Sequence, residues 1–294
     1  MISRRTFLQH SAFATATLGS TIGAVAAATA GPGWTVGCFN RAWTKWGMDA
    51  ALDGIKSAGF DVAGLLTRTK GEALIGADAT PEYLAALKKK IEMRKLTVNL
   101  GTIYPHFDLP KEQVVHDLQL QIDHGSLMGV KYLMNFGVDR KEDYEAYYRL
   151  MSMAAAYAAE RGVKVVLKPH GGASGSSEEI LRCLKAINHK NFSIWYDAGN
   201  IIHYTGKDPV TELEPIIEHV TGLCAKDCAE KKGEVMIQLG TGKVDFKAVF
   251  AKLKSAGFNG PIMLEGSDPG QSATEATANA RANREFLAKA LAAV

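Results

Sequence analysis

The sequence has little of what marks several protein classes, and cysteine is the clearest case. Only four cysteines occur among 294 residues, at positions 38, 183, 224 and 228. Cys224 and Cys228 are separated by three residues and lack a second cysteine pair, so the ligand spacing of a zinc ribbon is missing. We therefore expect free, buried thiols rather than a disulfide framework or a structural zinc site.

An excess of charge of one sign is also missing. Lys and Arg number 34 against 31 Asp and Glu, which gives a formal net charge of +3 with both signs spread along the chain. No basic block alternates with aromatic residues, as a nucleic-acid-binding surface requires. Nucleic acid is therefore not an expected partner, and a small-molecule ligand is favoured.

Long apolar runs are absent after the first thirty residues, so we expect no membrane-spanning segment in the rest of the chain. The start reads Ser3-Arg4-Arg5-Thr6-Phe7-Leu8, then a weakly apolar stretch rich in Ala, Thr and Gly, then Ala28-Thr29-Ala30. This is the order of a secretory signal with an A-x-A cleavage site, and the paired arginines resemble a twin-arginine signal. We expect residues 1–30 to be an export signal and the protein to be periplasmic, with an N-terminal membrane anchor as the alternative.

From Trp34 onward, short β-rich runs alternate with amphipathic helical stretches. The runs that we predict to be strands are 34–39, 61–66, 96–102, 131–136, 163–168, 192–196, 220–226 and 261–265. Apolar residues at helical spacing predict helices over 48–58, 80–94, 111–127, 141–161 and 271–292, with shorter ones near Glu178, Pro209 and Phe246. Several helices are followed by a glycine that suits a left-handed helix stop, as at Gly59, Gly162 and Gly257.

Eight strand-helix units without a linker or a break in composition predict one parallel α/β domain over residues 31–294. Eight such units close most naturally into a (β/α)8 TIM barrel. A doubly wound open sheet is the alternative. That fold usually carries a glycine-rich phosphate-binding turn after its first strand, but this position holds Asn40-Arg41-Ala42-Trp43. The barrel is therefore favoured.

Polar side chains follow most of the predicted strands, and the strand ends of a barrel meet at one mouth, where barrel enzymes bind substrate. Lys168 and His170 lie two residues apart at the end of the fifth strand, so we expect them to face the same way. These two residues, with Asp197 and Glu265 at the ends of the sixth and eighth strands, are the catalytic candidates. Arg41, taken alone, is typical of a solvated loop residue. The candidate substrate-binding residues are Asn40, Trp43, Arg68, Tyr104, His106, Asn135, Asn200, His203 and Lys226.

Several motifs occur in a fixed order at these strand ends. They are Leu167-Lys168-Pro169-His170-Gly171, Trp195-Tyr196-Asp197-Ala198-Gly199-Asn200, Lys226-Asp227, Leu239-Gly240-Thr241-Gly242-Lys243-Val244-Asp245-Phe246 and Met263-Leu264-Glu265. In this order the chain resembles the xylose isomerase-like TIM barrels, the sugar phosphate isomerase/epimerase superfamily, over essentially all of residues 31–294. The resemblance implies a divalent metal held by carboxylates and a histidine. It also implies a small carbohydrate substrate that loses a proton next to its carbonyl group.

The chain departs from the family at two of the four metal-ligand positions. Lys168 stands where the family has a ligand glutamate, and Cys224 stands where it has a ligand histidine, whereas Asp197 and Glu265 match. A protonated lysine cannot ligate a metal, so the favoured interpretation is a metal-free site in which the ammonium group takes the place of the cation. The alternative keeps a divalent ion, zinc or manganese, with His170, Asp197 and Glu265 as ligands.

The resemblance and the residues together favour a periplasmic enzyme of isomerase or epimerase type that acts on a non-phosphorylated sugar or keto-sugar. Glu265 or Asp197 is the expected base, and His170 its acid or base partner. Lys168 is expected to stabilise the enolate oxygen, while Trp43 and Tyr104 offer aromatic faces for a sugar ring. One alternative is a lyase or dehydratase that cleaves a keto-sugar or 3-keto-glycoside by β-elimination. Another is a non-catalytic carbohydrate-binding barrel, and the sequence is compatible with a homo-oligomer.

Overall fold

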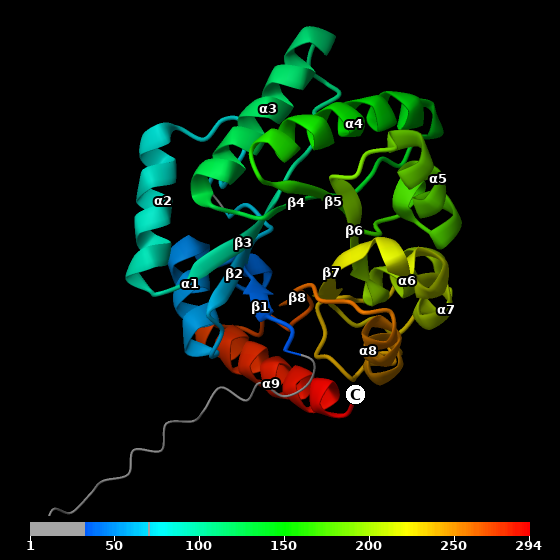
Figure 1. Ribbon diagram of the computed structural model, residues 1–294. Coiled ribbons are helices and arrows are strands. Elements are labelled where there is room, and N and C mark those ends of the chain that lie inside the picture. The colour runs from blue at the N-terminus through cyan, green and yellow to red at the C-terminus, as the bar shows by residue number, and fades with distance from the viewer. Residues whose placement is uncertain (1–32, 70) are drawn as a thin grey trace, which may run out of the picture.

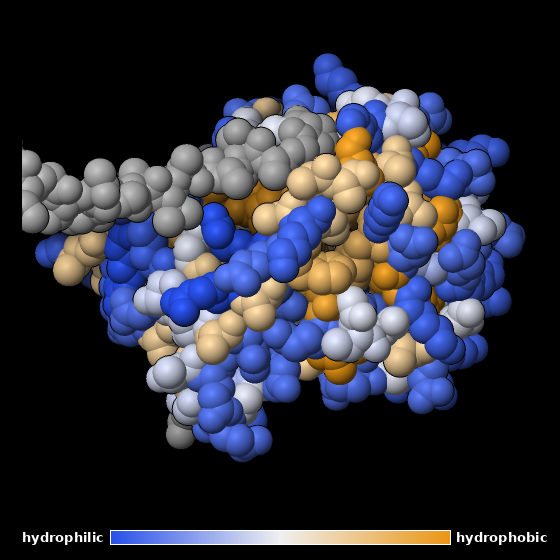
Figure 2. Space-filling view, turned by 90° about the horizontal axis from the view of Figure 1, so that it is seen from below, coloured by the Kyte–Doolittle hydropathy of each residue, from blue (hydrophilic) through white to orange (hydrophobic). Residues whose placement is uncertain are grey.

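The computed structural model describes residues 33–69 and 71–294 (Figure 1). The predicted export signal, residues 1–30, lies outside the described residues. Within the described ranges, no helix is both long and apolar enough to cross a membrane. All four cysteines are buried and free, as expected. On the face shown in Figure 2, hydrophilic and hydrophobic residues are interspersed.

The described part of the chain forms a closed barrel of eight parallel strands, in the order β1 to β8. Pairing of β1 with β8 closes the barrel and excludes the open-sheet alternative. The prediction of a single (β/α)8 TIM barrel is therefore confirmed. The strands are β1 (Val36–Phe39), β2 (Val62–Leu65), β3 (Thr97–Thr102), β4 (Tyr132–Asn135), β5 (Lys164–Leu167), β6 (Phe192–Asp197), β7 (Val220–Ala225) and β8 (Ile262–Leu264).

The helices surround the barrel as an outer ring (Figure 1). Local sequence explains several of their ends: the Thr80 side chain accepts a hydrogen bond from the Tyr83 N–H and caps α2, whose first residue is Pro81. Gly59, Gly162 and Gly257 have the positive φ angles expected of them. The helices are α1 (Gly47–Ser57), α2 (Pro81–Met93), α3 (Lys111–Met128), α4 (Tyr144–Glu160), α5 (Ser177–Ile187), α6 (Ala198–Thr205), α7 (Pro209–Leu213), α8 (Phe246–Ser255) and α9 (Ala273–Ala292).

The interior of the barrel is filled by an apolar plug, contributed by residues of several strands. Because successive side chains of a strand point to opposite faces, the residue two positions beyond each plug residue also points inward. In this way Val166 is followed by Lys168, Trp195 by Asp197, Cys224 by Lys226 and Met263 by Glu265. Strand alternation therefore places four ionisable groups directly beyond the plug. The plug consists of Phe39, Leu66, Leu100, Met134, Val166, Trp195, Cys224 and Met263.

A long loop joins β7 to α8, and the buried carboxylate of Asp227 holds it in shape. Its two oxygens accept hydrogen bonds from the backbone N–H groups of Cys228, Gly240, Gly242 and Val244, at 2.8 to 3.1 Å. Asp227 is completely buried and directly follows Lys226. The loop conformation and the position of Lys226 therefore depend on the same short segment.

We expect Asp227→Ala to lower the free energy of unfolding by about 3 kcal/mol or more, because four buried or part-buried N–H groups lose a charged acceptor. Urea denaturation followed by circular dichroism measures this difference. Asp208→Ala is the control, since it removes an exposed helix cap worth about 1 kcal/mol. A loss for Asp227→Ala no larger than that for the control would contradict the assignment.

Candidate active site

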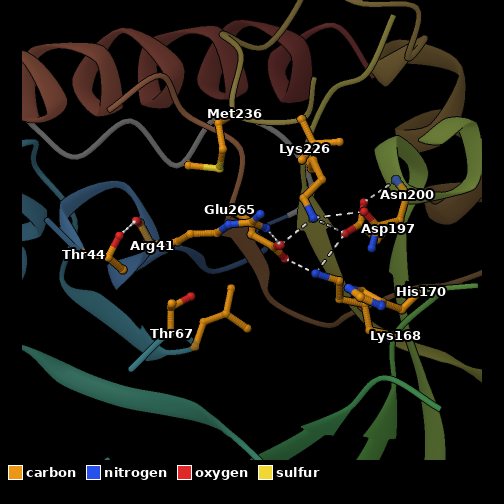
Figure 3. A network of polar contacts seen from close by, with 12 residues as sticks. Arg41, Thr44, Thr67, Lys168, His170, Asp197, Asn200, Lys226, Met236 and Glu265 are labelled. Carbon is orange, nitrogen blue, oxygen red and sulfur yellow. Dashed lines mark hydrogen bonds and ion pairs between the residues drawn. The ribbon is translucent and has the colours of Figure 1, made fainter. Parts of the chain in front are cut away.

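Two lysines and two carboxylates form a buried charged quartet at the carboxyl ends of the strands (Figure 3). The quartet consists of Lys168, Asp197, Lys226 and Glu265, and each is at most 2% exposed. Lys168 Nζ lies 2.5 Å from Glu265 Oε2 and 3.2 Å from Asp197 Oδ2. Lys226 Nζ lies 2.5 Å from Glu265 Oε1 and 3.2 Å from the same Asp197 oxygen. Each ammonium group therefore bridges both carboxylates.

Arg41 adds a third cation to this centre. It lies in the short 3-10 helix Asn40–Trp43 after β1, and its Nη1 is 2.6 Å from Glu265 Oε1. The Arg41 side chain is 31% exposed, whereas the Glu265 side chain is fully buried. Three cations against two carboxylates leave one positive charge in excess. The centre is therefore suited to stabilise a negative charge on a ligand.

Burial and neighbouring charges shift the pKa values of the quartet residues in different directions. Burial alone would raise the pKa of Glu265, but Lys168, Lys226 and Arg41 outweigh it and hold that pKa well below its usual range. Burial acts to lower the pKa of Lys168, but Glu265 and Asp197 reverse this and raise it. For Lys226, burial prevails over the two carboxylates and lowers the pKa. Lys168 therefore holds its proton more tightly than a free lysine, and Lys226 is the lysine that loses its proton more easily.

The start of α6 holds the Asp197 carboxylate in place. Its Oδ1 accepts a hydrogen bond from the Asn200 N–H at 2.9 Å, which caps the helix. Its Oδ2 is buried and close to both ammonium groups, yet it accepts no well-aligned hydrogen bond from the described residues. Asn200 also accepts a hydrogen bond from Lys226 Nζ at 3.0 Å and donates one to the Pro169 carbonyl at 2.6 Å. It therefore positions the quartet from below the cavity.

A cavity of about 930 Å³ opens above the quartet. We call its charged end, formed by Arg41, Lys168 and Glu265, the floor. From the floor the cavity extends to the loops after β2 and β3, where Arg68, Tyr104 and His106 line it, as the sequence predicted for a mouth. Lys226 and Asp197 are not among the lining residues and lie beneath the floor.

His170 lies beside the floor and faces the cavity, on the same side as Lys168, as alternation predicted. Partial desolvation by the surrounding protein lowers the pKa of His170 to about 4, and the positive charges of Lys168 and Lys226 add to this effect. The Tyr204 hydroxyl, from α6, lies 2.9 Å from His170 Nε2 and 3.1 Å from Nδ1. The imidazole is therefore neutral at physiological pH and is held by a tyrosine.

Three of the predicted substrate-binding residues, Asn40, Trp43 and Asn135, are completely buried and, like Asn200, His203 and Lys226, do not line the cavity. Trp43 is completely buried, because its indole packs against Gly54 and donates a hydrogen bond to Thr277 Oγ1 at 3.1 Å. The expectation that it stacks on a sugar is therefore wrong. The other two, Asn40 and Asn135, are also completely buried.

The side-chain amides of Asn40 and Asn135 make their hydrogen bonds to other groups of the protein. Asn40 Oδ1 accepts hydrogen bonds from the N–H groups of Leu66 and Thr67, and its Nδ2 donates to the Thr67 carbonyl, so it joins the ends of β1 and β2. Asn135 Nδ2 donates to the Val166 carbonyl, and its Oδ1 accepts from the Tyr147 hydroxyl. Both follow outward-facing strand residues by two positions, which explains why they point away from the mouth. Their assignment as substrate ligands is corrected accordingly.

His203 lies farther along α6 and does not line the cavity; its Nδ1 is 2.8 Å from the Gly233 carbonyl oxygen. Sequence reasoning missed two residues that do contact site residues, Arg41 and Tyr204. Arg41 stands two positions beyond the plug residue Phe39, so the alternation rule that placed Lys168 also applies to it. No sequence signal marked Tyr204, since its contact with His170 depends on how α6 packs.

The residues present do not fit a divalent metal ion. Ligand atoms of Asp197, Cys224 and Glu265 lie within 4.8 Å of one another, and His170 is not part of this group. Lys168 and Lys226, however, already contact both carboxylates and repel a further cation. Burial also raises the pKa of the Cys224 thiol well above its usual value, so it stays protonated and ligates poorly. Two ammonium groups here carry the same charge as one divalent ion.

Comparison with known proteins agrees with this fold. The sequence pattern described as "Xylose isomerase-like TIM barrel" matches residues 52–290. An inosose dehydratase from Geobacillus thermodenitrificans is 28% identical over 142 residues, which is 42% of this chain and 47% of that protein. The chain thus aligns with about half the length of this curated relative. Another inosose dehydratase, from Clostridium botulinum, is 23% identical over 63% of this chain and 74% of that protein.

Among solved structures, a D-psicose 3-epimerase from Clostridium cellulolyticum superposes with a TM-score of 0.71 at 13% identity. The superposition covers 87% of this chain and 99% of that one. At this identity the likeness shows the fold alone.

We expect the purified protein to bind no stoichiometric Mn²⁺ or Zn²⁺, because the two ammonium groups occupy the contacts of the carboxylates. Lys168→Glu replaces one cation by a carboxylate and is expected to gain binding of one ion. Elemental analysis and calorimetric titration measure both. Lys252→Glu is the control, because it makes the same charge change at an exposed surface pair with Glu214. Stoichiometric metal in the unmodified protein would contradict the assignment.

We expect His170 to stay neutral down to about pH 4, since its folded-state pKa lies near that value rather than near 6.5. Its charged form should appear only as the pH falls through about 4. Nuclear magnetic resonance of ¹³C-labelled histidine measures this titration, with His170→Asn to assign the signal. A midpoint near 6.5 would show that neither the desolvation of the imidazole nor the nearby ammonium groups lower its pKa.

Proposed function

Because the chain belongs to the xylose isomerase-like TIM barrel family, we propose that it is an enzyme of isomerase or epimerase type acting on a non-phosphorylated sugar or keto-sugar. The reaction starts with removal of a proton from the carbon next to a carbonyl group. The observation that carries this proposal is the charged quartet together with Arg41, which leaves one positive charge in excess at the floor of the cavity. Such a centre favours the enolate that forms when that proton leaves.

Lys168 and Arg41 are the groups that bind the substrate carbonyl oxygen in this proposal. Both line the cavity, and both donate to Glu265 in the free protein. Lys168 has a raised pKa, so it remains a hydrogen-bond donor as the oxygen becomes negative. Arg41 is the more exposed of the two, and its guanidinium has further N–H groups besides the one that contacts Glu265 with which to bind a ligand.

Glu265 accepts the proton from carbon. In the free protein three cations keep its pKa low, which makes it a weak base. When the carbonyl oxygen takes hydrogen bonds from Lys168 and Arg41, Glu265 loses part of this stabilisation and its proton affinity rises. Binding of the correct substrate thus activates the base. Asp197, which lies beneath the floor, holds the two lysines in place.

His170 is the second group for proton transfer. It faces the cavity in its neutral form and is oriented by the Tyr204 hydroxyl. A neutral imidazole can take a proton from a substrate hydroxyl and return it, which isomerisation of a hydroxy-ketone requires at the neighbouring oxygen.

A dehydratase or lyase is the second candidate, and the curated relatives support it. The two reported above are named inosose dehydratases, proteins that the chain matches in part of its length. Dehydration of a keto-sugar begins with the same proton abstraction, and the enolate then expels a group from the β-carbon. The same floor residues serve both outcomes.

We further propose that the protein works in the periplasm. The support is the twin-arginine pattern at Arg4-Arg5 and the A-x-A sequence at Ala28-Thr29-Ala30. Phosphorylated sugars are scarce outside the cytoplasm, which is why the proposed substrate is not phosphorylated. Fusion of residues 1–30 to a reporter that is active only after twin-arginine export tests this, with Arg4→Lys/Arg5→Lys as the matched control. Equal export by both fusions would reject it.

Exchange of substrate C–H hydrogen with deuterium from heavy water tests the proposed activity. We expect exchange with at least one member of a panel of D-fructose, D-allulose, D-tagatose, scyllo-inosose and 3-ketoglucose. Lys168→Met should slow this exchange by about 10²- to 10³-fold, because the enolate loses its main donor. Lys252→Met, at the surface, should leave it unchanged, and thermal melting of each variant checks that it is folded.

The products separate the candidate functions. An isomeric sugar supports the isomerase or epimerase, and an unsaturated ketone with its ultraviolet absorbance supports the dehydratase. Binding of a panel member without any exchange would reject both and leave a non-catalytic carbohydrate-binding barrel.

A further inference from the structure

Four rings form a continuous row along one wall of the cavity. In order they are His106, Tyr104, Phe136 and His170, and all four line the cavity. We call them the aromatic row. Successive ring centroids are 6.5, 5.4 and 5.2 Å apart. The first three rings stack with interplanar angles of 19° and 30°, whereas His170 meets Phe136 at 61°.

The row ends at the reactive floor. Lys168 Nζ lies 5.5 Å from the centroid of the Phe136 ring, and His170 is the group assigned above to proton transfer. At the other end, Tyr104 is 42% exposed, although a large aromatic side chain usually loses most of its contact with water. Its ring, next to His106 at the outer end, is therefore an open apolar surface in the part of the row that lies away from the floor.

The cavity is larger than the reaction requires. At about 930 Å³ it lies near the top of the range of about 300–1,000 Å³ that is usual for small-molecule sites. The groups that act on the substrate, Lys168, Glu265, Arg41 and His170, all lie at one end. A pyranose is similar in size to one aromatic ring, so a single sugar on the floor leaves the outer part of the row uncovered.

We propose that the outer part of the aromatic row, Tyr104 with His106, is a second subsite that binds a sugar ring joined to the reacting one. The substrate is then a disaccharide or related glycoside of a keto-sugar rather than a free monosaccharide. This inference rests on the proposed function in one respect only, namely that the reacting ring lies on the charged floor.

The charges around the outer part favour a neutral ring. Arg68 is paired with Asp78 through two hydrogen bonds of 2.7 and 3.0 Å, and His106 Nδ1 lies 2.8 Å from Asp117 Oδ2. Asp117 also accepts a hydrogen bond from Gln121, whose amide oxygen accepts from the Tyr104 N–H. These polar groups are held by partners within the protein, so they offer fixed hydrogen bonds to hydroxyl groups. Among the described residues that line this part of the cavity, Arg68 is paired with Asp78 and is not free to bind a phosphate or carboxylate.

Comparison of one-ring and two-ring substrates tests the subsite. We expect kcat/KM for 3-ketocellobiose to exceed that for methyl 3-ketoglucoside by about tenfold, the value of one aromatic stacking contact. Tyr104→Ala should lower kcat/KM for 3-ketocellobiose about tenfold more than kcat/KM for methyl 3-ketoglucoside and so remove this advantage, whereas Tyr104→Phe should keep it. Equal values for the one-ring and two-ring substrates, or an advantage that survives in Tyr104→Ala, would overturn the proposal.

Calorimetry with cellobiose and methyl glucoside, which lack the reacting carbonyl, separates this inference from the proposed function. We expect cellobiose to bind the unmodified protein and Tyr104→Phe about tenfold more tightly than methyl glucoside, and the difference to vanish in Tyr104→Ala. This result supports the subsite even when no ketone is turned over. Equally weak binding of both sugars by the unmodified protein overturns the subsite, whatever the enzyme does with its substrates.

Discussion

The burial of two ammonium groups between two carboxylates is the interaction on which the site depends. Removing one charge from water costs several kcal/mol, and only close opposite charges offset this cost. In the quartet each lysine touches both carboxylates, so loss of any one member leaves the other three with an unbalanced buried charge. The closed barrel and the apolar plug beneath the charges keep these opposite charges close together. Asn200 adds to this, because it hydrogen-bonds both Lys226 and the Pro169 carbonyl just after β5.

The same interaction creates the reactivity that we propose. A quartet of two cations and two anions would be neutral and inert, but Arg41 adds a positive charge from the side that faces the cavity. A ligand oxygen that becomes negative is therefore drawn to the floor. The centre carries the charge of a divalent ion on two side chains, and its geometry is fixed by covalent attachment to β5 and β7 rather than by metal-ligand distances. Removal of a lysine by mutation, rather than chelation, is therefore the way to take this charge away.

The cavity has two chemically different ends because different strand ends supply them. The later strands deliver charged groups onto the plug, whereas the loop after β3 and the end of β4 deliver Tyr104, His106 and Phe136. The charged groups bind the part of a ligand where a proton is removed and negative charge develops. The aromatic rings bind a neutral sugar ring without reacting with it. In the proposed substrate, the reacting ring would therefore lie on the charged floor and the second ring on the aromatic row.

The sequence by itself determined the barrel and the inward direction of Lys168, Asp197 and Glu265, because strand period and strand order are local properties that repeat along the chain. It also marked the replacement of two expected metal ligands by Lys168 and Cys224. Only the tertiary structure decided that Lys226 joins the quartet beneath the floor, that Arg41 reaches Glu265, and that Tyr204 holds His170. It also decided that Trp43 is buried against α9, whereas Tyr104 is left open. The physical reason is that such contacts join residues far apart in the chain, and their distances are set by strand stagger and helix packing, which the residue pattern of one segment does not contain.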